Sequence, residues 1–178
     1  MFGVVSGKHH PENDAIRILR DKGILVVGGF HSPMERECLD LLWRGSQPII
    51  LCYSKSLDRI KLGKPARTAL KEDRLLALSP FDRTIRRTTA ARAIIRNNLV
   101  AALSAAMLIP HATTGGRIWQ TVRQCIETGH PVFTFDDQAN ACLKDMGTKA
   151  YPIHIVCEQI SRHVDRIKTA HDDRGQIK

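Results

Sequence analysis

Residues 24–45 read ILVVGGFHSPMERECLDLLWRG, and this stretch decides the fold. The apolar run 24–27 predicts a strand, and two glycines follow it. Ser32 is then a candidate helix N-cap, with Pro33 at the first helical position and Glu35 three residues after the cap. This pattern is typical of a capping box. A buried strand that turns through glycines directly into a helix is the building unit of a parallel α/β sheet.

The same alternation continues along the chain. Strands are predicted at residues 2–5, 24–27, 48–53, 75–78, 107–109 and 131–135. Helices are predicted at residues 12–22, from 33 to the stop at Gly45, at 66–71, 85–105, 117–128 and 138–146, and beyond 152. This order predicts the α/β class, as a Rossmann-like open, mostly parallel sheet with helices on both faces.

The domain organisation follows from the same pattern. We expect residues 1–150 to form the Rossmann-like domain and residues 151–178 to add an amphipathic helix and a polar tail. One stripe of that helix carries apolar residues at helical spacing, namely Val156, Ile160, Val164 and Ile167. The stripe fits packing on the sheet and contact with a second subunit equally well.

Composition excludes several classes of protein. The chain has 178 residues, 43% of them hydrophobic, which is enough apolar content for a core without a metal or disulfide staple. Its five cysteines contain no CxxC pair, which favours reduced core thiols and a cytoplasmic protein. No apolar run is long enough to span a membrane, and the N-terminus lacks the pattern of a secretory signal. No motif indicates a cofactor or a metal, and no catalytic carboxylate pair or nucleophile arrangement is recognisable, so we lean against an enzyme.

Three loops at the predicted carboxyl edge of the sheet carry glycine, and ligands of open parallel sheets bind at that edge. They are residues 6–8, 28–32 and 111–117. Glycine lets a backbone approach an anion closely, and a helix N-terminus offers free N–H groups. Tight strand-to-helix turns also favour glycine and serine for purely local reasons, and neither GxGxxG nor GxxxxGK[ST] occurs. The candidate phosphate ligands in these loops are Ser6, Gly7, Lys8, Gly28, Gly29, His31, Ser32, Thr114, Gly115, Gly116 and Arg117.

The charge distribution also favours an anionic partner. The net charge is +9, and the chain between Asp82 and Glu127 contains arginines but no acidic residue. Arg86 and Arg87 fall at the start of the helix predicted at 85–105, where positive charge opposes the helix dipole unless an anion lies nearby. Arg96 and Asn97 follow on the same helix, and arginine forks suit phosphate geometry. The alternative is that these arginines face water or pair with distant acids.

Several segments, in order, resemble the DNA-processing protein A (DprA/Smf) family of the Rossmann-like SLOG nucleotide-binding superfamily. They are GGFHSPMERECLDLLWRG, QPIILCYSKS, LLALSPF, ARAIIRNNLVAALSAAMLIPHATTGG and GHPVFTFDDQANACL, which together cover about residues 4–147. The sharpest match is Arg96-Asn97-Asn98, where the family has Arg-Asn-Arg. The resemblance implies non-catalytic binding of single-stranded DNA, a recombination-mediator role with a recombinase partner in natural transformation, and a homodimer. By position, the loops at 6–8, 28–31 and 114–116 match the family's three glycine loops.

A neighbouring branch of the superfamily gives the alternative. The "lonely guy" phosphoribohydrolases carry Pro-Gly-Gly-x-Gly-Thr-x-x-Glu before the corresponding helix, whereas the catalytic glutamate position here holds Gln120 or nothing acidic. Glutamine cannot accept a proton as a carboxylate does, which disfavours hydrolysis of a nucleoside monophosphate. A nucleotide-binding sensor that uses the same loops is a third interpretation.

Asp136 and Asp137 fit either a ribose or metal contact or a helix cap.

Overall fold

The computed structural model describes residues 11–175. The strand predicted at 2–5 and the candidate ligands Ser6, Gly7 and Lys8 lie outside these residues. The helices are α1 (Pro11–Asp21), α2 (Pro33–Leu42), α3 (Lys64–Lys71), α4 (Ala90–Leu103), α5 (Arg117–Glu127), α6 (Ala141–Asp145), α7 (Ile153–Gly175) and the 3-10 turn η1 (Gln138–Asn140). The strands are β1 (Val26–Gly28), β2 (Ile49–Cys52), β3 (Leu75–Leu78), β4 (Met107–Leu108), β5 (Val132–Phe135) and β6 (Lys149–Tyr151).

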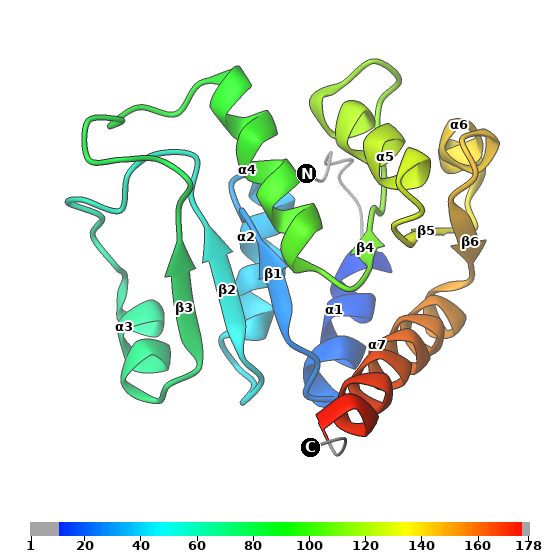
Figure 1. The fold of residues 1–178 in the computed structure, drawn as a ribbon, viewed down its shortest axis with the longest axis horizontal. Helices are drawn as coiled ribbons and strands as arrows, with labels where there is room; N and C mark the ends of the chain where they lie inside the picture. The colour runs from blue at the N-terminus through cyan, green and yellow to red at the C-terminus, as the bar shows by residue number, and fades with distance from the viewer. Residues whose placement is uncertain (1–10, 176–178) are drawn as a thin grey trace.

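Within residues 11–175 the strands form two three-stranded parallel sheets, ordered β1-β2-β3 and β4-β5-β6. Val26 lies opposite Ile49, and Ile49 lies opposite Leu75. In the second sheet Met107 lies opposite Val132. Helices α2 and α4 lie on opposite faces of β1 and β2 (Figure 1). The predicted Rossmann-like α/β class is therefore confirmed.

Helix α2 begins where the sequence predicts. The Glu35 amide donates to Ser32 Oγ at 3.2 Å, and the Glu35 carboxylate accepts from the Ser32 amide at 2.8 Å. This capping box gives hydrogen-bond partners to the backbone N–H groups of Ser32 and Glu35, which would otherwise lack them. Pro33 also fixes φ at a helical value at the first helical position. Met34, Cys38 and other apolar residues of α2 then pack against Ile49 and its neighbours, which seats the helix on the first sheet.

Helix α4 begins at Ala90, so the prediction that Arg86 and Arg87 open this helix was wrong. Thr89 is the N-cap, because its hydroxyl accepts from the Arg92 amide at 3.3 Å. The segment before it is held as a loop by hydrogen bonds to the chain that follows β2. The Ser56 amide donates to the Ile85 carbonyl at 2.7 Å. In a continuous helix that carbonyl would accept from an amide of the helix itself.

The C-terminal helix α7 packs on the body of the protein. Val156 and Ile160 are buried in a cluster with α1 and the β5 residue Phe133. Ile167, on the same stripe, remains 45% exposed. The first part of the apolar stripe is therefore core. The division of the chain at residue 150 stays a prediction. Within residues 11–175, no helix is long and apolar enough to cross a membrane.

Candidate functional site

The glycine loop after β1 is shaped by close packing. A Cβ atom at Gly29 would overlap the Arg96 guanidinium, and one at Gly28 would lie 2.8 Å from the Phe30 ring. Phe30 itself has a φ of 50°, a backbone angle that residues other than glycine adopt rarely. The two glycines are therefore required by the space that Arg96 and Phe30 occupy.

Arg96 supports this loop from inside the protein. It comes from α4 and is only 1% exposed. Asn97 beside it is 7% exposed. The structure thus places both residues behind the glycine loop, although the sequence alone suggested surface contacts. A phosphate contact by either side chain remains a prediction.

The donors at the start of α2 are already occupied. The Glu35 carboxylate accepts from the amides of both His31, at 3.0 Å, and Ser32, at 2.8 Å. A carboxylate at this place is the anion that a helix N-terminus favours. An external phosphate at this edge would therefore need other donors than these two amides.

A chain of polar side chains joins three loops beside that helix start. Ser54 Oγ, at the end of β2, is hydrogen-bonded to Thr88 Oγ1 at 3.0 Å and lies 3.5 Å from His31 Nε2. Ser54 is completely buried. Burial, and then the positive charge of Arg96, lower the pKa of His31 below its ordinary value. The imidazole is therefore neutral at pH 7 and can change charge when an anion approaches.

Ser54 and Thr88 were not among the predicted site residues. A signal was available for Ser54, because it is the second residue after a strongly apolar run and so falls at the carboxyl edge of the sheet. Thr88 carried no comparable signal, because its position depends on the loop that the sequence suggested was helix.

Arg86 and Arg87 are exposed on the loop that leads to Thr88. That loop is anchored, since Ser79 Oγ donates to the Lys55 carbonyl at 2.8 Å and Arg92 Nη1 donates to the Arg87 carbonyl at 2.7 Å. In Figure 1 the loop after β3 passes along the top of the molecule to the start of α4. The side chains of Arg86 and Arg87 therefore extend from an anchored loop, directly before Thr88, which is hydrogen-bonded to Ser54.

The third glycine loop leads into α5. Gly115 has a φ of 74°, and Gly116 is the N-cap of the helix with no side-chain hydrogen bond at the cap. Thr114 and Gly115 are exposed. Arg117 is the first residue of α5.

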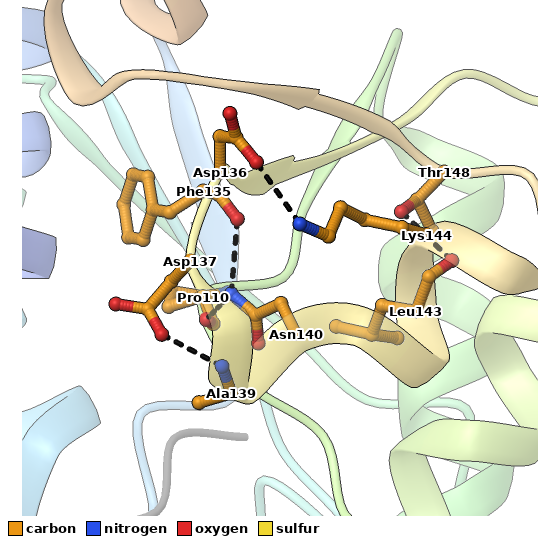
Figure 2. Close-up of polar contacts among 9 residues, drawn as sticks. All are labelled: Pro110, Phe135, Asp136, Asp137, Ala139, Asn140, Leu143, Lys144 and Thr148. Atoms are coloured by element: carbon orange, nitrogen blue, oxygen red, sulfur yellow. Dashed lines mark hydrogen bonds and ion pairs between the residues drawn. The ribbon is translucent and has the colours of Figure 1, made fainter.

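The end of β5 is occupied by structural contacts. Asn140 Nδ2 donates to the carbonyls of Pro110 and Phe135, at 2.8 and 3.1 Å, and so ties together the ends of β4 and β5 (Figure 2). Asp137 accepts from the Ala139 amide at 2.7 Å and caps η1. Asp136 pairs with Lys144 at 3.0 Å. Of the two interpretations of this acidic pair, the cap is confirmed for Asp137.

Groups of three or more histidine, cysteine or acidic side chains that could hold a metal are absent from the described part of the chain. Gln120, at or near the position of the catalytic glutamate of the phosphoribohydrolases, is an exposed residue of α5. All five cysteines are free thiols, and four of them are buried.

Comparison with solved structures identifies the fold. DNA processing protein A from Helicobacter pylori, whose single-stranded DNA binding mode has been described, matches with a TM-score of 0.69 at 18% identity, over 90% of this chain and 78% of that one. DNA processing protein A (DprA) from Streptococcus pneumoniae matches with a TM-score of 0.62 at 16% identity, over 79% of this chain and 52% of that one.

The chain therefore matches about half the length of the S. pneumoniae structure. Comparisons with protein-family models and with curated proteins find no match. The two solved structures confirm the resemblance seen in the sequence, and this chain has the fold of DNA-processing protein A.

Proposed function

We propose that the protein binds single-stranded DNA through its phosphate backbone, without cleaving it, in a DNA-processing role. The observation that carries the proposal is the pair of exposed arginines, Arg86 and Arg87, on an anchored loop at the carboxyl edge of the first sheet. The H. pylori protein of the same fold binds single-stranded DNA. Guanidinium groups contact phosphates with paired, charge-assisted hydrogen bonds, and such contacts need no particular base sequence.

Each part of the edge has a proposed role. Arg86 and Arg87 contact phosphates directly. His31 is linked to their loop through Ser54 and Thr88, and its imidazole gains a proton as a phosphate approaches. Gly28 and Gly29 let the strand of DNA come close to the backbone, while Arg96 holds their loop in place from behind. The remaining proposed contacts are Ser6, Gly7, Lys8, Ser32, Asn97, Thr114, Gly115, Gly116 and Arg117.

The test is a double charge reversal with a matched control. Arg86→Glu with Arg87→Glu removes two phosphate contacts, so it should weaken binding to a labelled oligonucleotide. It should also reduce the slope of log K against log salt by about 1.4, since each single-strand contact contributes about 0.7. Arg67→Glu with Lys71→Glu makes the same change of net charge on α3, whose side chains at these positions are exposed. Equal effects of the two pairs would remove the loop from the interface.

A nucleotide-binding sensor is the second candidate. The observation that favours it is the α5 N-terminus, where Gly116 provides no side-chain cap and backbone N–H groups can receive a single phosphate group. Tight binding of one mononucleotide with little affinity for DNA would support this candidate. Hydrolysis of a nucleoside monophosphate is disfavoured by Gln120, and the absence of free base in a product assay would exclude it.

The partners and the setting are also proposals. A homodimer and a recombinase partner in natural transformation follow from the family resemblance. Sedimentation of the purified protein tests the homodimer. Co-purification with a recombinase on a DNA strand tests the recombinase partner. Free thiols at all five cysteines support a reducing, cytoplasmic setting.

A further inference from the structure

A hollow of about 410 Å³ lies beyond the carboxyl ends of β2 and β3. The loops that follow these two strands form its walls, with Leu57 and Asp58 on one loop and Phe81, Asp82 and Arg83 on the other. Within the described part of the chain, its lining includes no residue of the glycine loops. Sites of about 300–1,000 Å³ hold small organic ligands, so the hollow has room for one planar ring system.

Hydrogen bonds hold both walls of the hollow in place. Ser79 Oγ donates to the Lys55 carbonyl at 2.8 Å and accepts from the Phe81 amide at 3.1 Å, so it joins the two loops. On the opposite wall the Asp58 amide donates to Ser56 Oγ at 2.9 Å. The side chains of Phe81 and Asp58 therefore extend from anchored backbone, and a ligand does not have to order these loops.

The lining combines apolar and acidic surface. Leu57 is 40% exposed and Phe81 is half-buried, so both offer apolar surface to a ligand. Asp82 Oδ1 accepts from the Thr84 hydroxyl at 2.6 Å and from the Thr84 amide at 2.8 Å. These hydrogen bonds lower the pKa of Asp82, so it is a carboxylate at pH 7. Asp58 is a second exposed acid. Acidic side chains repel a phosphate from the hollow and favour a flat ring that carries N–H donors.

The hollow adjoins the loop that is proposed to bind phosphates. The Ser56 amide, on the wall of the hollow, donates to the Ile85 carbonyl at 2.7 Å. Arg86 and Arg87 follow Ile85 directly, and Arg83 lines the hollow itself. A DNA strand whose phosphates lie on Arg86 and Arg87 therefore passes beside the hollow, and one of its bases can enter it.

We propose that the hollow binds one base of that single strand and that it prefers guanine. The base lies against Phe81 and Leu57, because unpaired bases stack on aromatic rings. The Asp58 carboxylate accepts from the ring N1–H and from the N2 amino group, the two neighbouring donors on the Watson–Crick edge of guanine. Thymine presents a single N–H between two carbonyl oxygens, which a carboxylate repels. The inference deepens the proposed function and rests on it, because the phosphates on Arg86 and Arg87 bring the base to the hollow.

Strands that differ only in their bases test the site in the wild-type protein. Fluorescence anisotropy compares three labelled oligonucleotides of equal length, one of alternating guanine and thymine, one of thymine alone, and one without bases. We expect the guanine-containing strand to bind at least about fivefold more tightly than the thymine strand, as one bidentate contact provides. Equal affinities for these two strands would overturn the inference and leave the phosphate contacts standing. Absence of binding to any strand would overturn both claims.

Removal of the aromatic ring gives a second readout. Phe81→Leu keeps apolar packing and should weaken binding of the guanine-containing strand by at least about fivefold, because the stacking of one base is lost. Binding of the strand without bases should change by less than about twofold, since it uses only phosphate contacts. Phe81→Tyr keeps the ring and should bind as the wild type does. Equal weakening for both strands in Phe81→Leu would overturn the inference, because the ring would then only support its loop.

Asp58→Asn tests the contact that sets the preference. It should bring the ratio of the guanine-strand and thymine-strand affinities to about one, because the bidentate acceptor is lost. Asp73→Asn is the matched control, since it makes the same change of charge in the turn between α3 and β3, and asparagine tolerates the φ of 54° at this position. Asp73→Asn should keep the wild-type ratio. A guanine preference that persists in Asp58→Asn would overturn the proposed contact.

Discussion

The packing of Gly29 against Arg96 gives the sharpest test of how the site is built. In Gly29→Ala the new methyl group would overlap Nη1 and Cζ of the buried guanidinium. Arg96 is 1% exposed and cannot move aside without disturbing its surroundings. Overpacking of this kind typically costs about 1–3 kcal/mol. For a protein of this size, each kcal/mol lowers the Tm by about 2–4 °C.

A double-mutant cycle isolates that contact. The leucine in Arg96→Leu ends at the position of Cδ, short of Nη1, Cζ and Nε, the three atoms that would crowd the new methyl group. We therefore expect Gly29→Ala to cost less than about 0.5 kcal/mol in the Arg96→Leu background, which gives a coupling energy of about 1–3 kcal/mol. The assay is urea denaturation of the wild type, both single variants and the double variant, with unchanged m-values as a condition.

The control substitution is Gly63→Ser. The nearest atom to a Cβ at Gly63 is Pro65 Cδ at 3.9 Å, so there is room for a side chain. Gly63 is also the N-cap of α3, a position that serine favours. Gly63→Ser should leave the free energy of unfolding unchanged or raise it slightly. If Gly29→Ala costs the same in both Arg96 backgrounds, the structural role given to Arg96 is refuted.

Three further outcomes follow from named contacts. Ser32→Ala removes the α2 cap and should cost about 1 kcal/mol in urea denaturation, and a wild-type midpoint would exclude the capping box. Asn140→Leu leaves the carbonyls of Pro110 and Phe135 without their donor and should cost about 1–3 kcal/mol, whereas an unchanged midpoint would mean that water replaces the amide. The lowered pKa of His31 means that neutral imidazole is favoured in the free protein, so its contribution to stability is present above the unfolded pKa and is lost as the pH falls through the folded pKa. A bound phosphate favours the protonated form, so DNA affinity should rise as the pH falls from 7.5 to 5.5. The measured affinity of His31→Gln should lack this rise, and an equal rise in the variant would exclude His31 from the site.

Local patterns predicted much of the fold. Ser32, Pro33 and Glu35 marked the start of α2, because a capping box depends on residues only three apart. The buried runs that became β2 and β5 were visible as continuous apolar segments. Strand β6 was missed, since its three residues are half-exposed and give no periodic signal.

The site was harder to predict, because tertiary contacts decide it. Arg96 looked like a surface arginine in the sequence, and only the packing of α4 on the glycine loop places it inside. The start of α4 moved to Ala90 because hydrogen bonds between distant loops hold the preceding residues out of the helix. Ser54 and His31 meet although they are 23 positions apart, which no local spacing rule could indicate.

The central claim is that the carboxyl edge binds a DNA backbone. The most direct measurement is a fluorescence anisotropy titration of the wild-type protein with a labelled single-stranded oligonucleotide at two salt concentrations, in competition with AMP and ATP. We predict binding that weakens steeply with salt and that the mononucleotides displace poorly, since several phosphates are held at once. Absence of oligonucleotide binding, or complete displacement by a stoichiometric mononucleotide, would contradict the account.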